Sequence, residues 1–359
     1  MTDSRYMALA LSLGRRGHGR VWPNPAVGCV IVKDGRIVGR GWTQPGGRPH
    51  AETIALSQAG DKARGGVAYV TLEPCAHHGR TPPCADALLK AGIARAVVAL
   101  TDPDPRVNGQ GLARLRAGGV DVTEGVLAEA ARADQAGFLS RVTLGRPMVT
   151  LKLAASFDGR IATASGESRW ITGPAARRAV HALRLGHDAV MIGGGTARAD
   201  DPALTVRGLG AAHQPVRVVL SRGLDLPPDG RLAASARDVP LWLVHGGDAD
   251  AAARAAWDAR GARLVTVPVA GGRLDPGAAL AALGAQGLTR VFCEGGGVLA
   301  ASLLGAGLVD RLVGFTAGMA IGAEGRPAIS ALGLARLADA PRFSLVESRD
   351  LGGDAMHIW

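Results

Sequence analysis

The stretch Pro49-His50-Ala51-Glu52 and, after an apolar run, the stretch Glu73-Pro74-Cys75-Ala76-His77-His78-Gly79-Arg80-Thr81-Pro82-Pro83-Cys84 organise the first half of the chain. The imidazole of His50 and the thiols of Cys75 and Cys84 are three ligands of the kind that Zn²⁺ prefers. Three protein ligands leave a fourth position open for water, as a catalytic zinc ion requires. These residue types therefore predict a catalytic zinc site.

Glu52 follows His50 by two residues and supplies a carboxylate that the site does not need as a ligand. Beside a water at the open position it is placed to carry protons. The pattern resembles the signature of zinc nucleobase deaminases, although eight residues separate Cys75 from Cys84 instead of two. The alternative is a closed structural site with His77 or His78 as a fourth ligand, which leaves Glu52 without a role.

Composition indicates a globular protein of two domains, which we expect in the cytoplasm. A chain of 359 residues exceeds one typical core, and 47% hydrophobic with 20% charged residues is typical of a globular protein. No secretory signal is visible at the start, and no apolar run approaches the roughly 18 residues that span a membrane. Cys29 and Cys293 lie in apolar, strand-like runs and are expected to be buried thiols.

The net charge of +10 raises the question of a nucleic-acid partner. Residues 1–145 carry 18 Lys and Arg against 12 Asp and Glu, and the remainder carries 23 against 19, so the excess is diffuse. No basic cluster with interleaved aromatic residues is visible, and a groove that follows phosphates normally needs both. We therefore expect small anionic ligands and no nucleic acid.

Helix and strand patterns alternate through the first half. We expect helices over 2–14, 50–60, 84–92, 112–117 and 127–138, and strands over 68–72, 95–100 and 120–123. Strands over 27–32 and 37–41 should form a β-hairpin, because Asp34-Gly35 supplies the positive φ angles of a type I′ turn. Thr143 to Pro147 is predicted as a connector, with domains of residues 1–146 and 147–359.

The second half is predicted to be α/β as well, with strands over 148–155, 189–192, 216–220, 241–244, 263–267 and 290–293. Lys152 interrupts the first of these strands, so its ammonium either reaches past the sheet edge or points into a site. Glu294-Gly295-Gly296-Gly297 precedes a helix expected from Val298, where backbone N–H groups favour phosphate. An ordinary turn explains these glycines equally well, and the absence of G-x-G-x-x-G disfavours a Rossmann dehydrogenase.

Longer runs of the first half resemble the RibD family of bifunctional riboflavin-biosynthesis deaminase/reductases. They are 74–84, Pro23-Asn24-Pro25-Ala26-Val27-Gly28 and Thr101-Asp102-Pro103. The resemblance implies a cytidine-deaminase-like three-layer domain in which zinc hydroxide replaces the amine of a phosphoribosylated diaminopyrimidinone and Glu52 shuttles protons. It also implies substrate contacts from Asn24, Arg80, Asp102 and Asp104. Asp104 stands where the family commonly has Asn, and Thr43 where His is frequent.

The resemblance continues through 151–160, 165–172, 199–207 and 294–296. It implies a dihydrofolate-reductase-like α/β domain that uses NADPH to reduce the ribosyl side chain of the deaminated product to ribityl. The implied cofactor site is lined by Ala154, Trp170, Thr196, Asp200, Ser221, Gly296, Gly297 and Val298. The implied reductase substrate site is lined by Lys152, Ser168, Arg184, Leu204, Arg207 and Glu294.

Several points stay open from the sequence. Lys152 and Asp200 are candidates for assisting the opening of the sugar ring, although Asp200 could cap a helix. A nucleic-acid-editing deaminase with an RNA-docking second domain and a zinc-stabilised binding module without catalysis are the rival hypotheses. The diffuse charge argues against the first, and Glu52 argues against the second. We expect a homo-oligomer formed through the reductase domain.

Overall fold

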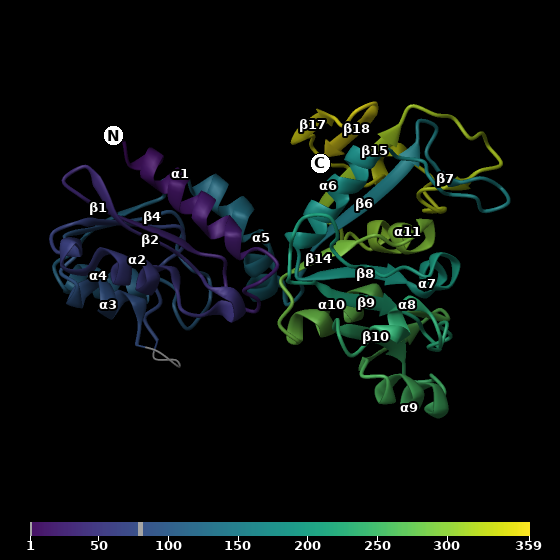
Figure 1. The fold of residues 1–359 in the computed structure, drawn as a ribbon, viewed down its shortest axis with the longest axis horizontal. Coiled ribbons are helices and arrows are strands. Elements are labelled where there is room, and N and C mark those ends of the chain that lie inside the picture. The colour runs from purple at the N-terminus through teal and green to yellow at the C-terminus, as the bar shows by residue number, and fades with distance from the viewer. Residues whose placement is uncertain (1, 78–81) are drawn as a thin grey trace. The chain divides into compact units, whose positions relative to one another are not determined.

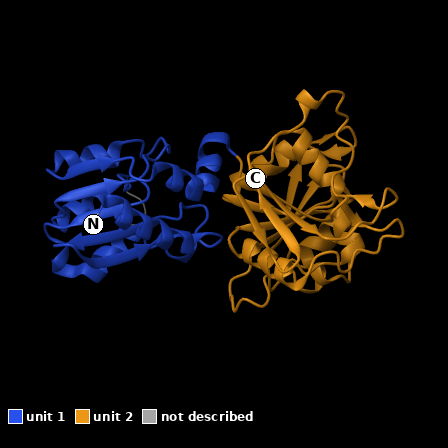
Figure 2. Ribbon diagram, turned by 90° about the horizontal axis from the view of Figure 1, so that it is seen from above, with its two compact units in different colours: residues 1–145 blue, residues 146–359 orange. Residues whose placement is uncertain are grey.

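The computed structural model describes residues 2–77 and 82–359. The chain divides into two compact units, unit 1 over Met1–Gly145 and unit 2 over Arg146–Trp359 (Figure 2). The division follows the end of a long helix, where Gly145 adopts a φ of 70° that terminates helical hydrogen bonding. Each unit is described by itself below.

Unit 1 has α/β architecture. Within its described residues a five-stranded sheet has the order β2-β1-β3-β4-β5, in which β1 pairs antiparallel with β2 and β3, and the remaining pairs are parallel. Helices cover both faces, with α1 and α5 on one face and α2, α3 and α4 on the other (Figure 1). The elements are α1 (Asp3–Gly14), β1 (Gly28–Lys33), β2 (Arg36–Trp42), α2 (Ala51–Ala59), β3 (Val67–Val70), α3 (Cys84–Lys90), β4 (Arg95–Val98), α4 (Gln110–Ala117), β5 (Asp121–Glu124) and α5 (Ala128–Leu144).

The predicted hairpin is confirmed. Asp34 and Gly35 connect β1 to β2 with φ angles of 50° and 72°, as a type I′ turn requires. Thr2 precedes α1 as expected, but its side chain makes no capping hydrogen bond. The predicted connector is wrong at Thr143 and Leu144, which continue α5 until Gly145, in the left-handed conformation, ends the helix.

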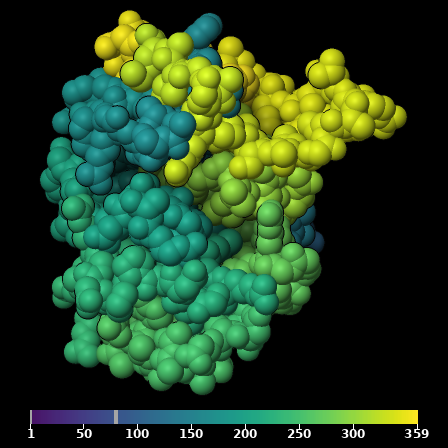
Figure 3. All heavy atoms as spheres, turned by 90° about the vertical axis from the view of Figure 1, so that its right-hand side faces the viewer, coloured from purple at the N-terminus to yellow at the C-terminus, as the bar shows by residue number. Residues whose placement is uncertain are grey.

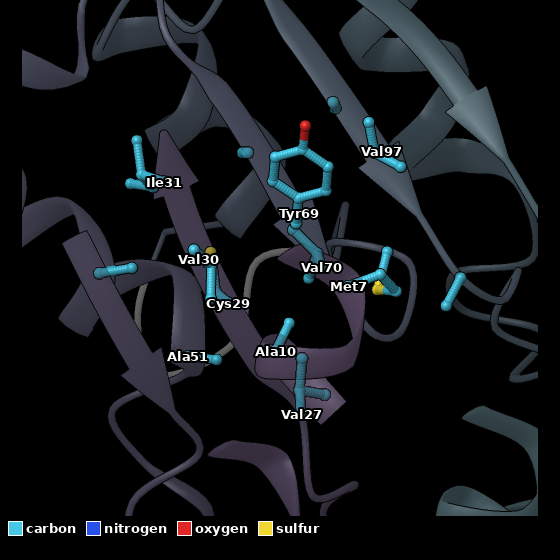
Figure 4. Packing of buried hydrophobic residues seen from close by; sticks show 14 of the residues in the cluster. Met7, Ala10, Val27, Cys29, Val30, Ile31, Ala51, Tyr69, Val70 and Val97 are labelled. Atoms are coloured by element: carbon cyan, nitrogen blue, oxygen red, sulfur yellow. The ribbon is translucent and has the colours of Figure 1, made fainter. Parts of the chain in front are cut away.

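Aliphatic side chains fill the core of unit 1. Figure 4 shows Ala10 of α1 and Ala51 of α2 beside β1, in one cluster with Cys29 and Val30. All of these side chains are buried. In the described chain all four cysteines are free, and the expectation that Cys29 and Cys293 are buried thiols is confirmed.

Glycine lets the helices of unit 1 approach the sheet closely. A Cβ on Gly41 of β2 would lie 2.0 Å from the carbonyl oxygen of Ala51, and one on Gly39 would lie 2.2 Å from that of Ala55. On the other face, a Cβ on Gly28 would lie 1.8 Å from the carbonyl oxygen of Ala10. The backbones of α1 and α2 therefore rest directly on strand backbone.

Unit 2 is built on a nine-stranded sheet with the order β11-β10-β9-β8-β14-β6-β15-β18-β17. From β11 to β15 in this order, each strand is parallel to its neighbours. At the other end of the sheet, β18 pairs antiparallel with β15, and β17 pairs antiparallel with β18. The helices are α6 (Pro174–Leu185), α7 (Gly194–Asp200), α8 (Arg231–Ala234), α9 (Ala251–Ala259), α10 (Pro276–Ala285) and α11 (Gly297–Gly305). The strands are β6 (Met148–Ser156), β7 (Arg160–Ala162), β8 (Ala189–Gly193), β9 (Val216–Leu220), β10 (Leu241–Gly246), β11 (Arg263–Val267), β12 (Val269–Ala270), β13 (Arg273–Leu274), β14 (Arg290–Cys293), β15 (Arg311–Ala317), β16 (Arg326–Pro327), β17 (Glu347–Asp350) and β18 (Asp354–Ile358).

The register of the parallel strands places the end of β14 beside the middle of β6 and close to the end of β8. Cys293, the last residue of β14, pairs with Leu151 of β6 on one side and with Met191 of β8 on the other. Glu294 therefore emerges level with Lys152. Ligands of open parallel sheets bind at the carboxyl ends of the strands.

Elsewhere on the unit, residues 332–346 are largely exposed, and the late part of the chain, yellow in Figure 3, forms an arm on the surface. Within the described residues no helix is long and apolar enough to cross a membrane.

Candidate active sites

Three elements of unit 1 bring His50, Cys75 and Cys84 together. His50 occupies the N-cap of α2, Cys75 follows β3, and Cys84 is the first residue of α3. The Nδ1 atom of His50 lies 3.3 Å from the Sγ atom of Cys84 and 3.7 Å from that of Cys75. All three ligand atoms lie within 4.8 Å of one another. Ligand atoms around one tetrahedral zinc ion are separated by roughly 3.5 Å, so the set fits such an ion.

The electrostatics of this cluster favour one thiolate, on Cys75. Hydrogen bonds with Cys84 and His50 lower the pKa of the Cys75 thiol well below its usual range, although burial opposes them. The hydrogen bond with Cys75 raises the pKa of His50. The backbone N–H of Cys84 also donates to Cys75 Sγ at 3.3 Å. A thiolate is thus favoured on Cys75, and thiolate is the form of cysteine that binds metals. The hydrogen bond with Cys75 and burial raise the pKa of the Cys84 thiol, so metal binding there must displace a proton.

Glu52 lies in the first turn of α2 and is only 3% exposed. Burial raises the pKa of its carboxyl to about 7, against the opposing charge of His50. A hydrogen bond joins it to the Cys84 side chain. A buried carboxyl with a pKa near neutrality can both accept and donate a proton.

The alternative with a fourth protein ligand gains no support from the described residues. His77 is not in the group of ligand atoms that the structure brings together, and His78 lies outside the described residues. A closed structural zinc site would also leave the side chain of Glu52 without a role.

Glu73 is a site residue that the sequence interpretation did not single out. It is buried at the end of β3, two residues before Cys75, and its carboxylate accepts backbone N–H groups from Asp102, Gly109, Gly111 and Leu112 at 2.8–3.3 Å. It therefore fixes the loop after β4 beside the zinc ligands. The only sequence signal for Glu73 is a carboxylate that follows a buried strand. Its hydrogen-bond partners are backbone N–H groups, which cannot be recognised from residue types.

The loop held by Glu73 carries two predicted substrate residues. Asp102 is buried, and burial raises the pKa of its carboxyl to about 6. Its Oδ1 accepts the backbone N–H of Asp104 at 2.9 Å. Asp104 is buried as well, and its ion pair with Arg106 holds its pKa below the usual range.

The other predicted contacts of unit 1 lie on neighbouring loops. Asn24 packs against Gly47, whose Cβ position would lie 1.9 Å from the side-chain nitrogen of Asn24, in the loop that leads to His50. Thr43 is buried and accepts the backbone N–H of Val27 at 3.0 Å, so its hydroxyl joins two backbone segments. The predicted contact from Arg80 lies outside the described residues.

In unit 2 an ion cluster occupies the carboxyl edge of the sheet. The Glu294 carboxylate pairs with Arg184 of α6 through bonds of 2.5 and 3.2 Å and lies 3.8 Å from the Lys152 ammonium. Arg184 also donates to the carbonyl of Thr205 at 2.8 Å, next to the buried Leu204. Burial alone would raise the pKa of Glu294, but Arg184 and Lys152 hold it below the usual range.

Two neighbouring turns gather several predicted cofactor residues. The backbone N–H of Gly296, the N-cap of α11, donates to the Thr196 hydroxyl of α7 at 3.1 Å. Gly297 begins α11, and Val298 follows it with an exposed side chain. At the end of β9, the buried Ser221 donates to Asp225 at 2.8 Å.

The remaining predicted residues of unit 2 are more dispersed. Trp170 is exposed beneath the guanidinium of Arg177 at 4.3 Å, and the backbone of Arg207 donates to His181 at 3.3 Å. Ser168 is exposed, and Ala154 lies in β6 against a small apolar cluster. Asp200 is the last residue of α7, so the alternative of an N-terminal helix cap does not apply.

Comparison with known families identifies both units. Residues 1–100 match the cytidine and deoxycytidylate deaminase zinc-binding region, and residues 147–357 match the RibD C-terminal domain. The chain is 44% identical to the riboflavin biosynthesis protein RibD of Escherichia coli, covering 100% of this chain and 99% of the relative. It is 38% identical to that of Bacillus amyloliquefaciens, covering 98% and 94%.

Solved structures agree with these matches. A RibD of Acinetobacter baumannii aligns with a TM-score of 0.88 at 37% identity, covering 99% of this chain and 98% of that one. A diaminohydroxyphosphoribosylaminopyrimidine deaminase/5-amino-6-(5-phosphoribosylamino)uracil reductase of Thermotoga maritima aligns with a TM-score of 0.86 at 33% identity, covering 99% and 97%. The predicted fold class is thereby confirmed for both domains.

These matches also decide between the functional hypotheses. A deaminase domain followed by a RibD reductase domain implies zinc for the first and NADPH for the second, and it does not favour RNA editing. The His50, Cys75 and Cys84 cluster agrees with the zinc requirement. The chain belongs to the RibD family of bifunctional deaminase/reductases of riboflavin biosynthesis.

Proposed function

We propose that unit 1 deaminates 2,5-diamino-6-(5-phosphoribosylamino)pyrimidin-4-one, and that unit 2 then reduces the ribosyl side chain of 5-amino-6-(5-phosphoribosylamino)uracil to ribityl with NADPH. The observation that carries the first step is the His50, Cys75 and Cys84 cluster beside the buried Glu52. The name of the Thermotoga maritima structure supports the choice of both substrates. The product of the first reaction is the substrate of the second, which explains why one chain contains both domains.

In the deamination, His50, Cys75 and Cys84 would hold zinc. Zinc, when bound, lowers the pKa of a water molecule at the open position. Glu52 takes a proton from the attacking water and delivers one to the departing amine, so that ammonia leaves. Its burial excludes bulk water and keeps its pKa near neutrality, which suits both transfers.

Side chains around the cluster bind the pyrimidine and its sugar phosphate. We assign this role to Asn24, Asp102 and Asp104, and by resemblance to Arg80. Glu73 acts through the loop: its four backbone bonds hold Asp102 and Asp104 beside Cys75. It is a positioning residue.

In the reduction, the chain holds cofactor and substrate at the sheet edge. NADPH, when bound, supplies the two reducing electrons. Its site comprises Ala154, Trp170, Thr196, Asp200, Ser221, Gly296, Gly297 and Val298. The substrate site comprises Lys152, Ser168, Arg184, Leu204, Arg207 and Glu294. Two cations share one carboxylate in the Lys152, Arg184 and Glu294 cluster, so the edge stays net positive and suits the substrate's 5-phosphate.

The finer assignments follow from the same proposal. Domains of residues 1–146 and 147–359 carry the two activities, acting on small molecules and not on nucleic acid. Pairing through the reductase domain would give a homo-oligomer. Free, buried thiols at Cys29 and Cys293 suit a reducing cytoplasm.

A coupled assay tests the two activities together. Wild type and Glu52→Ala are given the diaminopyrimidine, with and without NADPH, and ammonia release and NADPH oxidation are followed. Ammonia release should fall by about 10²–10⁴-fold in the variant, because its proton carrier is gone. NADPH oxidation should persist when the deaminated intermediate is supplied. Undiminished ammonia release would contradict the role of Glu52.

A further inference from the structure

Arg106 stands out in unit 1 because its side chain is exposed yet held in one orientation. Its Nε atom donates to both carboxylate oxygens of Asp104 at 2.9 and 3.2 Å, and its Nη2 atom donates to Oδ2 at 2.5 Å. The side chain is 71% exposed, whereas that of Asp104 is only 10% exposed. A buried carboxylate therefore anchors a guanidinium that faces solvent.

The anchoring leaves the outer edge of the guanidinium available. Arginine presents five N–H groups in a planar fork, and Asp104 occupies the edge formed by Nε and Nη2. Within residues 2–77 and 82–359, no hydrogen-bond partner is found for Nη1. The edge formed by Nη1 and Nη2 can therefore donate two parallel bonds to one more anion, the geometry in which arginine binds phosphate.

Backbone hydrogen bonds connect the loop that carries Arg106 to the segment that carries Cys75. The backbone N–H of Arg106 donates to Asp104 Oδ1 at 2.9 Å, and Glu73 holds the same loop next to Cys75. The charge of His77, two residues after Cys75, contributes to lowering the pKa of Asp104. Ion pairs between two exposed side chains are usually mobile and weak. In this pair the Asp104 carboxylate is buried, and it holds the exposed guanidinium of Arg106 in place.

We propose that Arg106 binds the 5-phosphate of the deaminase substrate through its outer guanidinium edge, and that Asp104 orients it. The inference rests on the proposed function, because it requires a phosphorylated substrate in unit 1. Arg106 then contributes to substrate specificity and affinity, while the proton transfers stay with Glu52. The Asp104–Arg106 pair is neutral overall, so directed hydrogen bonds, more than net charge, provide the recognition.

Steady-state kinetics of ammonia release test this assignment with two substrates, the phosphoribosylated pyrimidine and the same riboside without phosphate. In Arg106→Gln the KM for the phosphorylated substrate should rise about tenfold or more, with little change in kcat. The KM for the riboside should not change. Arg106→Lys keeps the charge without the fork and should give an intermediate KM.

Controls separate this role from a structural one. Arg116→Gln removes a similarly exposed arginine that pairs with Glu124 in the same unit, and it should behave as wild type. Bound zinc per chain reports whether each variant is folded. Asp104→Asn should raise the KM, and its effect in the Arg106→Gln background should be smaller than in the wild-type background, because Asp104 acts partly through Arg106.

Other outcomes would overturn the inference. An unchanged KM in Arg106→Gln, or an equal rise in KM for both substrates, would show that Arg106 does not bind the phosphate. The same holds if Arg48→Gln, next to Pro49-His50, shows the phosphate-dependent loss instead. If wild type releases ammonia from neither substrate, the proposed function fails, which is a different result from a failure of Arg106 alone.

Discussion

In unit 1 the ligand atoms come from residues close in sequence, with His50 and Cys84 only 34 positions apart. In unit 2 the side chains of Arg184, in α6, and Glu294, directly after β14, come from positions 110 apart and meet only through the tertiary fold. The first site gathers three donor atoms around a position for a metal ion, whereas the second pairs one carboxylate with two cations. The ligands of a metal centre can lie within one short stretch of sequence. The residues proposed to bind a cofactor and a sugar phosphate are distant in sequence and come together only when the sheet forms.

The difference predicts that losing one zinc ligand abolishes one activity alone. In Cys75→Ser, bound zinc should fall from about one per chain to nearly none, and ammonia release should fall below detection, since a hydroxyl is a poor replacement for thiolate. NADPH oxidation with the deaminated intermediate should continue. Metal analysis and the two separate assays check this. Cys29→Ala, which removes a buried thiol of the same unit, should retain zinc, and retention of zinc in Cys75→Ser would refute the ligand set.

The reciprocal change in unit 2 should destabilise as well as inactivate. Arg184→Met leaves the Glu294 carboxylate, which is 9% exposed, with Lys152 at 3.8 Å as its remaining cation. We expect the free energy of unfolding of unit 2 to fall by about 3 kcal/mol, and reduction to slow at least tenfold, with ammonia release intact. Urea unfolding and NADPH oxidation measure the two effects. Arg336→Met, an exposed partner of Asp339, should change neither; equal effects from both variants would count against the cluster.

Glu73 tests whether unit 1 also depends on support from outside the short motif. Glu73→Gln keeps the size of the side chain but loses the charge that four backbone N–H groups contact. The expected loss is about 2–3 kcal/mol of unfolding free energy, with slower ammonia release but normal zinc content. Glu129→Gln, on an exposed carboxylate of α5, provides the control. Loss of zinc in Glu73→Gln would mean that the loop and the ligand set are not separable.

A smaller effect should appear in the pH dependence of stability. Burial raises the pKa of Asp102 to about 6 in the folded state, above its unfolded value, so the folded chain binds the extra proton first as pH falls. Relative to Asp102→Asn, wild type should gain about 2 kcal/mol of unfolding free energy between pH 7 and pH 4.5. Urea unfolding of both proteins at the two pH values measures the difference. A constant difference would show that Asp102 is not perturbed by burial.

Much of unit 1 could be predicted because its signals are local. The hairpin follows from Asp34-Gly35, and the ligand cluster follows from His50, Cys75 and Cys84 lying at helix starts beside a strand end. The contacts of Glu73 could not be predicted, because all of its partners are backbone N–H groups, which every residue type except proline offers. Extension of α5 through Leu144 was missed for a similar reason: the stop depends on the conformation of Gly145.

In unit 2 the sequence supports the strands but not their assembly. Lys152 within an apolar strand and Glu294 before three glycines were visible as unusual, yet nothing local shows that they face each other. Their contact requires the register in which Cys293 pairs with Leu151. Only the resemblance to a family connected Arg184 with them in advance.

The glycines of β2 have a consequence for how the zinc site tolerates mutation. Because Gly41 and Gly39 leave no side chain between strand and helix, the carbonyl groups of Ala51 and Ala55 sit against the strand itself. No layer of adjustable side chains is present at these two points to absorb a change. A methyl group at Gly41 would have to displace α2, and with it His50 and Glu52, so a mutational constraint on the metal centre falls on a strand that contributes no ligand.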